Sequence, residues 1–429
     1  MGAKGVEPTM DRRNGSHYGK SQPSSRKRRL LFGFLDQGIV SGTSLINFVA
    51  AAQFLPSDDL GYFSFSVATC VLTVSLIRAV CGESLIVRAV GRSNFRPTVA
   101  RDSRSMLGVA AILSLLASVL CVGAGVVGPA LSWPLIASAV ACPGLVLQDS
   151  LRFVFISMQR TKSLLLNDAG TLVLGTAAIA ISGFLTRDVF VMVAAWGLAS
   201  LSVTVGTLVF NAMAPSLRGV LPWFRLTWRT SSAFFTESAL GAMVGYLIIV
   251  MLTIFVDPSE VAAYRATVVV FGVSSLVLNF LRTQVLRELR VDMIDSVNGV
   301  LRISMRLLVP VIVTIVGMLG ALLVMPEWMG NALMRDTWIL VGALIIPGAI
   351  SRLFAGFSTI PTITLRVQGV TWKATVIKIC VLSSSLIIGP AAALYAGAAG
   401  ALYADALAYG LTSILLFALS IRRAKLMSS

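Results

Sequence analysis

Apolar runs of about 20 residues recur along the whole chain and limit what it can fold into more than any other feature. A helical run of this length crosses the roughly 30 Å hydrocarbon layer of a bilayer. Hydrophobic residues make up 56% of the chain and charged residues only 13%, whereas soluble domains carry about 25% charged residues. A transmembrane barrel would instead show segments of about ten residues that alternate apolar and polar side chains. The sequence therefore predicts an all-α polytopic membrane protein.

We expect about twelve transmembrane helices in two lobes of six. The lobes are residues 30–210 and 231–421, joined by a basic connection at 211–230. A polar tail, 1–29, lacks the apolar core of a cleaved signal peptide and is expected to be disordered, and residues 422–429 form a C-terminal tail. The expected spans are approximately 31–55, 61–82, 105–127, 131–153, 167–185, 189–210, 231–256, 261–281, 301–325, 335–357, 374–395 and 398–420.

Basic residues gather in alternate connections, which predicts the orientation of the chain. In the turns between these basic connections, Arg187 is the only basic residue. The positive-inside rule therefore places the basic connections and both termini in the cytoplasm. This topology accounts for the net charge of +16 without nucleic acid as a partner. The cluster Arg26-Lys27-Arg28-Arg29 before the first span is expected to contact anionic membrane lipids. In the connection 211–230, aromatic residues amid arginines predict either a segment lying along the inner interface or an ordinary aromatic belt.

A phrase near the start returns in the second half and suggests an internal duplication. Pro56-Ser57-Asp58 precedes Tyr62, and Pro258-Ser259-Glu260 precedes Tyr264, a separation of 258 − 56 = 202 positions. Each phrase is typical of a helix start, so two copies could also arise by chance. The matching positions in two halves of similar hydropathy favour duplication, and repeats of this size are typical of transporters with a substrate path between the repeats. We predict that the halves superpose by rotation about the membrane normal.

The chain offers little to metal, cofactor or nucleophilic chemistry. Its single histidine, His17, lies in the polar tail, and its five cysteines lie in apolar runs without metal-ligand or disulfide spacing. We therefore expect no metal site, no cofactor, no catalytic residue and no enzymatic activity.

Ionisable residues within the apolar runs are the candidate functional residues, because each costs about 2.5–3.5 kcal/mol on insertion and usually faces a cavity or a partner. For those near helix ends, snorkelling to the interface is the alternative. Asp149 and Arg152 are three residues apart and are expected to pair along one helix face. The candidates are Asp36 with Gln37, Arg78, Glu83, Asp149, Arg152, Asp168, Glu237, Arg265, Arg352 and Asp405.

Arg78 and Arg352 are the stronger candidates, since each lies about one turn inside its run and lacks an acidic residue three or four positions away. The planar guanidinium group donates bidentate hydrogen bonds to phosphate oxygens, so a cavity lined by arginines suits a phosphate-bearing ligand. Asp36 and Glu237 begin corresponding spans and could carry a coupling proton, or could simply lie at the interface. The predicted substrate-binding residues are Arg78, Arg352, Arg152 and Arg265, and the predicted polar cleft or coupling residues are Asp36, Gln37, Asn47 and Glu237.

Several phrases resemble a known family. They are Leu35-Asp36-Gln37-Gly38 with Ser41-Gly42, Asn47-Phe48, Ala52-Gln53-Phe54-Leu55 and Gly61-Tyr62-Phe63, then Gln148-Asp149, Arg152-Phe153, Arg160, Asn167-Asp168 and Tyr264-Arg265-Ala266. Together they resemble polysaccharide and O-antigen lipid-carrier flippases of the multidrug/oligosaccharidyl-lipid/polysaccharide (MOP) transporter superfamily. The resemblance covers most of residues 30–420, although each motif alone is degenerate. The family's Ala-Arg before the first outer turn is Ala52-Gln53 here, which puts in doubt a charged group at that level.

The resemblance implies two six-helix lobes that form a V-shaped cleft opening alternately to either side of a bacterial plasma membrane. It implies an undecaprenyl-diphosphate-linked oligosaccharide as substrate, with cleft arginines on the diphosphate and the lipid tail left in the bilayer. Membrane lipids, a polysaccharide polymerase and glycosyltransferases are the implied partners.

Three other classes stay open. An ion-coupled multidrug or metabolite exporter of the same superfamily should favour carboxylates and aromatics in its cleft. A membrane glycosyltransferase or polymer ligase typically needs a sizeable outer loop, whereas every outer turn here is short. A scaffold that recruits other enzymes through the basic tail would leave the charges inside the spans without a purpose.

Overall fold

The computed structural model describes residues 38–39, 42–90, 96–128, 131–272, 274, 277–278 and 293–428. Regular structure within these ranges is helical throughout. The helices are α2 (Ser57–Val80), α3 (Gly82–Val90), α4 (Arg96–Val127), α5 (Ser132–Ser157), α6 (Thr161–Thr186), α7 (Val189–Phe210), α8 (Val220–Met251), α9 (Pro258–Phe271), α11 (Val297–Val324), α12 (Glu327–Met334), α13 (Thr337–Val367) and α14 (Thr371–Ser428). A short apolar helix, Gly42–Ala52, precedes α2, and a π-helical turn, Leu252–Val256, follows α8.

The predicted spans are all represented in the described residues. Nine helical segments there are long and apolar enough to cross a membrane, and α14 contains two of the predicted spans because Ala396 and Gly397 interrupt it with non-helical backbone. The first and eighth predicted spans correspond to Gly42–Ala52 and to α9, whose neighbouring residues lie outside the described ranges. The prediction of an all-α polytopic membrane fold with about twelve spans is therefore confirmed, since 9 + 1 + 2 = 12.

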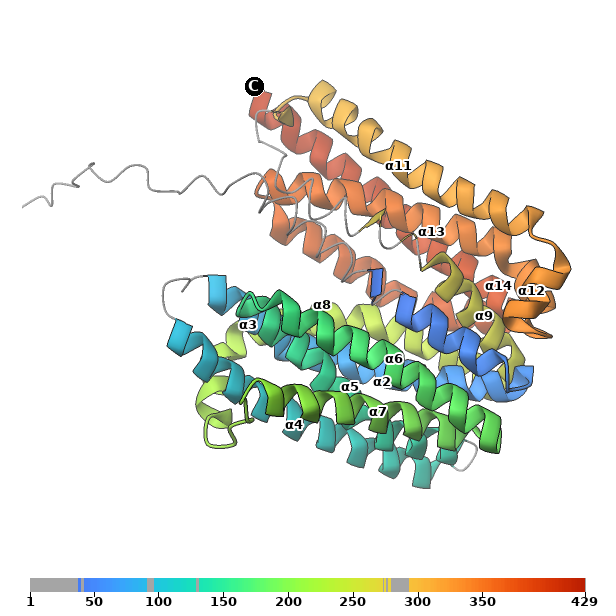
Figure 1. The fold of residues 1–429 in the computed structure, drawn as a ribbon. Coiled ribbons are helices and arrows are strands. Elements are labelled where there is room, and N and C mark those ends of the chain that lie inside the picture. The colour runs from blue at the N-terminus through green and yellow to red at the C-terminus, as the bar shows by residue number, and fades with distance from the viewer. Residues whose placement is uncertain are drawn as a thin grey trace, which may run out of the picture.

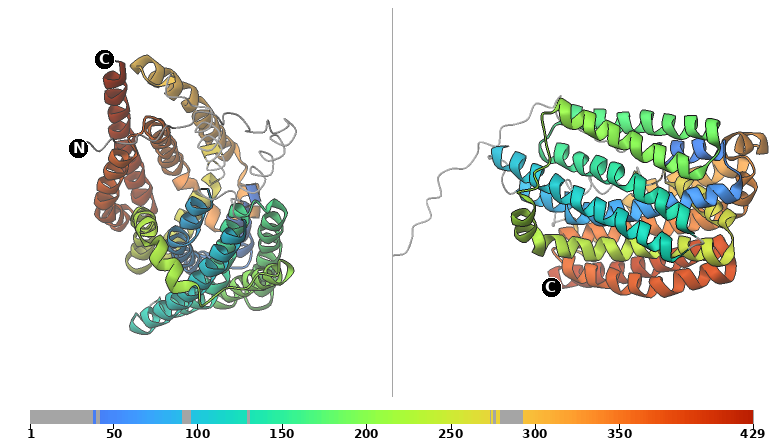
Figure 2. Two further views of the ribbon diagram at one scale, coloured as in Figure 1. Left: turned by 90° about the vertical axis from the view of Figure 1, so that its left-hand side faces the viewer. Right: turned by 90° about the horizontal axis from the view of Figure 1, so that it is seen from below.

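The helices form two bundles that lie side by side (Figures 1 and 2). Helices α4 to α7 lie in one bundle, and α11, α13 and α14 lie in the other. Between them, α2 packs against both α8 and α9, and α8 also packs against α14. The bundles converge at the end that holds α12 and diverge toward the end that holds α3 and the C-terminus (Figure 1).

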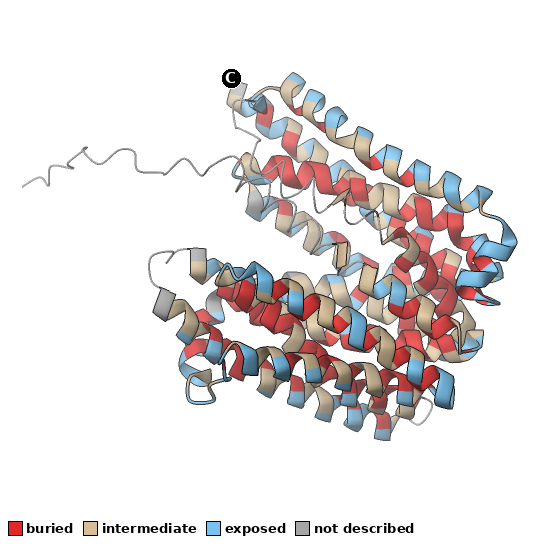
Figure 3. Cartoon of the chain, viewed as in Figure 1, coloured by how far each residue is buried: buried red, intermediate tan, exposed pale blue. Residues whose placement is uncertain are grey.

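Buried residues concentrate where helices face one another, and exposed residues cover the outer surfaces (Figure 3). The apolar span of α11 is only 11% buried, although its mean hydropathy is 2.8. An apolar surface of this kind is stable when lipid replaces water around it, because lipid tails are as apolar as the side chains. The burial pattern thus agrees with a bilayer as the solvent.

Both repeated sequence motifs lie at helix starts. The first helical residues of the two motifs differ by one position when Pro56 is aligned with Pro258. Helix α2 begins at Ser57 after Pro56, and α9 begins at Pro258, where the Asp257 carboxylate accepts a 2.7 Å hydrogen bond from the Ser259 backbone N–H. Proline at a helix start costs nothing, because its missing N–H would have had no partner there. Superposition of the halves by rotation stays a prediction.

The lobes meet at the convergent end through close backbone approach. A Cβ atom on Gly61 of α2 would lie 1.9 Å from the carbonyl oxygen of Pro258 at the start of α9, so only glycine fits there. The Gln53 side-chain amide donates hydrogen bonds of 2.9 Å each to the carbonyls of Ala332 and Leu333 at the end of α12. These contacts join the first lobe to the second at the end predicted to face outward.

Two segments outside the expected spans are partly or wholly helical in the structure. The connection 211–230 is irregular only as far as Gly219, because α8 begins at Val220. Within it, Trp223 is only 2% exposed and belongs to the core of the first lobe, whereas Trp228 is 54% exposed. The C-terminal tail continues α14 to Ser428. The tail at 1–29 lies outside the described residues.

Candidate functional site

A cavity of about 500 Å³ lies between α2 of the first lobe and helices of the second. The α2 wall is small and apolar apart from Ser75, with Ala68, Val71 and Leu72. The opposite walls come from α8, α9, α13 and α14 and carry the charged and hydroxyl side chains. A cavity whose walls come from both lobes changes shape when the lobes move relative to each other, which is where a transport site is expected.

The described side chains that line this cavity include more cations than anions. Among the described residues that line it, the cations are Arg265 of α9, Arg352 of α13 and Lys378 of α14, and the only anion is Asp405 of α14. The sum is +3 − 1 = +2. Arg265, Arg352 and Asp405 belong to three different expected spans, 261–281, 335–357 and 398–420, and the structure brings them to one cavity.

Arg265 and Arg352 make no hydrogen bond and no direct ion pair with any residue in the described part of the chain, although the Asp405 carboxylate in the same cavity interacts electrostatically with Arg352. The Nε of Arg265 is buried and has no hydrogen-bond partner in that part of the chain. The hydrogen bond that Asp405 accepts comes from a neutral group, because the Tyr264 hydroxyl donates to its Oδ2 at 3.3 Å. The buried Arg265 Nε is costly to leave unsatisfied, so it favours a ligand that can accept its hydrogen bond, as the oxygen of an anion can.

Hydroxyl groups line the remaining polar wall, and their orientation makes them acceptors. Thr362 donates to the Ser358 carbonyl at 2.8 Å, Ser385 to the Val381 carbonyl at 2.9 Å, and Thr412 to the Ala408 carbonyl at 2.8 Å. Each hydroxyl hydrogen is thus used within its own helix, and the oxygen lone pairs remain for a ligand. The cavity therefore combines cationic donors with a wall of neutral acceptors.

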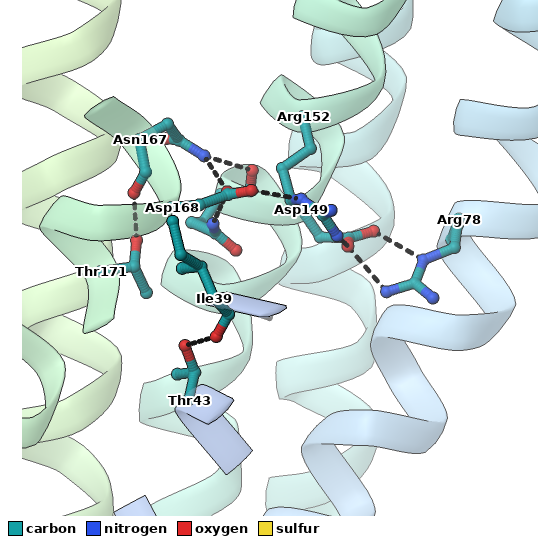
Figure 4. A network of polar contacts seen from close by, with 9 residues as sticks. Ile39, Thr43, Arg78, Asp149, Arg152, Asn167, Asp168 and Thr171 are labelled. Atoms are coloured by element: carbon teal, nitrogen blue, oxygen red, sulfur yellow. Dashed lines mark hydrogen bonds and ion pairs between the residues drawn. The ribbon is translucent and has the colours of Figure 1, made fainter. Parts of the chain in front are cut away.

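A second group of charges lies within the first lobe and is internally neutralised (Figure 4). Arg78 of α2 binds Asp149 of α5 in a bidentate pair, Nε to Oδ2 at 2.9 Å and Nη2 to Oδ1 at 2.7 Å. Arg152 Nε donates to Asp168 Oδ2 of α6 at 2.8 Å, and its Nη1 lies 3.9 Å from Asp149 Oδ1. The Asp149–Arg152 contact confirms the pairing expected from their spacing.

Amide groups complete this network around Asp168. Gln148 and Asn167 donate to its Oδ1 at 3.0 and 3.2 Å, and Thr171 donates to the Asn167 carbonyl at 2.9 Å. The side chains of Arg152 and Asp168 are only 11% and 2% exposed. The network borders a smaller cavity of about 200 Å³ and joins α2, α5 and α6 into one unit.

The structure thus separates the four predicted arginines into two pairs. Arg265 and Arg352 share the central cavity, whereas Arg78 and Arg152 lie in the neutralised network of the first lobe. Arg78 has an acidic partner after all, on a neighbouring helix, which its own helical spacing could not reveal. The guanidinium of Arg78 also lies 5.8 Å from the ring centre of Phe153.

The other predicted residues lie elsewhere or outside the described structure. Asn47 is 6% exposed, and its side-chain oxygen accepts a 2.7 Å hydrogen bond from Thr176. Asp36 and Gln37 lie outside the described residues, and so does the side chain of Glu237 in α8. Lys378 was missed, although a lysine inside the expected span 374–395 was a signal that sequence reasoning could have used.

The sequence matches no protein-family model and no curated protein. Its fold does match solved structures. The lipid II flippase MurJ in an inward closed conformation has a TM-score of 0.64 at 12% identity, over 93% of this chain and 90% of that one.

An inward-facing multidrug resistance MATE family transporter of the MOP superfamily has a TM-score of 0.58 at 13% identity, over 91% and 95%. The eukaryotic MATE transporter AtDTX14 has a TM-score of 0.58 at 11% identity, over 94% and 98%. Likenesses at such identities concern the fold alone. The chain therefore has the two-lobed helical fold seen in transporters of the MOP superfamily.

Proposed function

We propose that this protein is a transporter that moves an undecaprenyl-diphosphate-linked oligosaccharide across the bacterial plasma membrane by alternating access. The observation that carries the proposal is the central cavity, where Arg265 and Arg352 face a shared space and neither donates a hydrogen bond to a described carboxylate. The lobes would present this cavity to one side of the membrane and then the other, without covalent chemistry.

The fold by itself does not choose between substrates, because its solved neighbours include both a lipid II flippase and multidrug resistance transporters. Charge is the feature that discriminates. An exporter of cationic drugs would place net negative charge in the cavity, since a desolvated cation needs a carboxylate partner. The described lining holds the two arginines Arg265 and Arg352 against the single carboxylate Asp405, which favours an anionic substrate.

Different residues of the cavity wall would bind the diphosphate and the sugar of a glycan diphosphate. The guanidinium forks of Arg265 and Arg352 would hold diphosphate oxygens. The acceptor oxygens of Ser385 and Thr412 would receive hydrogen bonds from sugar hydroxyls. The lipid tail would remain in the bilayer, so that only the polar headgroup enters the cavity.

The arginines of the first lobe take a different part in this proposal. Because Arg78 and Arg152 already bind Asp149 and Asp168, they would stiffen the first lobe so that it moves as one body. A coupling proton on Asp36 or Glu237, cytoplasmic termini, and a polysaccharide polymerase and glycosyltransferases as partners remain predictions.

The test is flipping of a fluorescent undecaprenyl-diphosphate-linked oligosaccharide in vesicles, at subsaturating substrate and normalised to folded protein. We expect Arg265→Gln and Arg352→Gln each to weaken substrate binding about tenfold to a hundredfold, since a hydrogen bond to a charged group contributes about 1.5–3 kcal/mol. Arg352→Lys should recover only part, because lysine keeps the charge but loses the fork. Arg306→Gln, on the exposed face of α11, is the matched control.

Unchanged normalised flipping in both glutamine variants would remove these residues from the site. Efflux of a cationic dye by the native protein, with no flipping of the lipid-linked glycan, would instead favour the multidrug exporter.

A further inference from the structure

A third cavity, about 1030 Å³ in volume, lies entirely within the first lobe and apart from the central one. Its walls come from α3, the start of α4, the turn between α5 and α6, and the connection between α7 and α8. These segments are among the basic connections, at the end of the lobe that the positive-inside rule assigns to the cytoplasm. The proposed transport route does not use this cavity.

The chemistry of its lining is amphipathic and positive. Two guanidinium groups, Arg104 of α4 and Arg160 after α5, are the only charged side chains among its described lining residues. Most of the remaining wall is apolar, including Ile86, Val99 and Met213. No carboxylate in the described lining offsets the two positive charges.

The arginines are held in place by the connection between α7 and α8. Arg160 Nη1 donates to the Asn211 side-chain oxygen at 3.3 Å, and that oxygen also accepts from Ser163 at 3.0 Å. Arg104 Nη2 lies 3.5 Å from the carbonyl of Ala212. Each of these bonds uses one guanidinium nitrogen, so further N–H donors on both arginines remain for a ligand.

Two residues next to Arg160 and Asn211 have a left-handed backbone conformation. Gln159 and Ala212 have positive φ angles of 57° and 50°, in a left-handed region that favours glycine. Each follows the end of a helix, where such a residue turns the chain sharply. These turns bring Arg160 and Asn211 to the same cavity.

We propose that this cavity binds the headgroup phosphate of an anionic phospholipid, with Arg104 and Arg160 on the phosphate and the apolar wall against the glycerol and first acyl carbons. The volume of about 1030 Å³ exceeds what a free phosphate could fill and lies at the upper end of the range of about 300–1,000 Å³ typical of small-molecule sites. Anionic lipid is concentrated in the cytoplasmic leaflet, where basic groups attract it.

The test uses purified full-length protein in a neutral detergent and a fluorescent dioctanoyl phosphatidylglycerol as probe. We expect saturable binding that inorganic phosphate and dioctanoyl phosphatidylcholine displace at least about tenfold less well than unlabelled phosphatidylglycerol. Arg104→Gln should weaken probe binding about tenfold, as expected for loss of a charge-assisted hydrogen bond. Arg101→Gln, an exposed neighbour on the same helix outside the cavity lining, should leave binding unchanged.

Arg160→Gln should act like Arg104→Gln, but it also removes a contact to Asn211, so its helical content is checked by circular dichroism. If that variant unfolds, Arg104→Gln decides. Three results would overturn the proposal: equal displacement by phosphatidylcholine, equal displacement by inorganic phosphate, or native binding in folded Arg104→Gln.

Discussion

Replacing Gly61 by alanine should open the convergent end of the two lobes. The added Cβ would lie 1.9 Å from the carbonyl oxygen of Pro258 and 2.4 Å from its carbonyl carbon. Ordinary van der Waals contact begins at 3.4 Å, so the atoms must separate by about 3.4 − 1.9 = 1.5 Å. Both obstructing atoms are backbone at the start of α9, so no side-chain rotation can relieve the clash. The relief must come from movement of α2 away from α9.

The size of the effect follows from the packing of this contact. Overpacking of a close-packed contact typically costs about 1–3 kcal/mol, and this cost falls on the closed arrangement alone. The equilibrium between closed and open convergent ends should then shift about 5- to 150-fold toward open. Under the proposed function, a chain biased toward one state should also transport more slowly, because each cycle must revisit the other state.

Spin labels report this movement directly. With Cys380 replaced by serine, labels at exposed Leu185 and Glu327 lie on the two lobes near the convergent end. Double electron–electron resonance should give a longer mean distance for Gly61→Ala than for the native chain. Gly206→Ala is the control, because no atom lies within 4 Å of its added Cβ. An unchanged distance distribution and unchanged flipping in Gly61→Ala would refute the inference that this contact closes the lobes.

Two further predictions concern stability in detergent, measured by thermal or chemical unfolding. Asp168→Asn should lower the free energy of unfolding by about 3 kcal/mol, because it leaves the buried Arg152 guanidinium without its 2.8 Å carboxylate partner. The double variant with Arg152→Gln should regain part of the loss, and a single variant as stable as the native chain would contradict the assigned pair. Gly397→Ala should destabilise by at least about 1–2 kcal/mol, because φ is +59° and the Glu260 carboxylate lies 2.8 Å from the new Cβ. Gly320→Ala, with nothing within 4 Å of its Cβ, should not destabilise, and equal melting temperatures for these two alanine variants would count against the strain argument.

Much of the fold could be predicted from local patterns because the bilayer imposes local rules. A run of about 20 apolar residues must satisfy its backbone hydrogen bonds within itself, so each run predicts a helix without any knowledge of its neighbours. The phrases at Pro56 and Pro258 predicted helix starts for the same reason, since proline and a nearby carboxylate act within one turn. Helix α8 begins at Val220, ahead of the expected span 231–256, and the missing information there was tertiary, because Trp223 packs into the core of the first lobe.

The candidate site was predicted only in part. The sequence shows which charged residues lie within a span, but it does not show which of them form ion pairs with residues on other helices. The sequence identified charged residues inside the spans, since their insertion cost makes them rare. It could not tell that Asp149 of α5 binds Arg78 of α2, 71 residues away, whereas neither Arg265 nor Arg352 donates a hydrogen bond to a carboxylate in the described structure. Which arginine is bound to a carboxylate and which faces a cavity depends on how helices pack side by side. Composition and the length of the apolar runs thus determined the membrane class and the helices of this protein. Only tertiary packing decided which positive charges remain available to a ligand, because ion pairs form between helices and no single span encodes its contacts with the others.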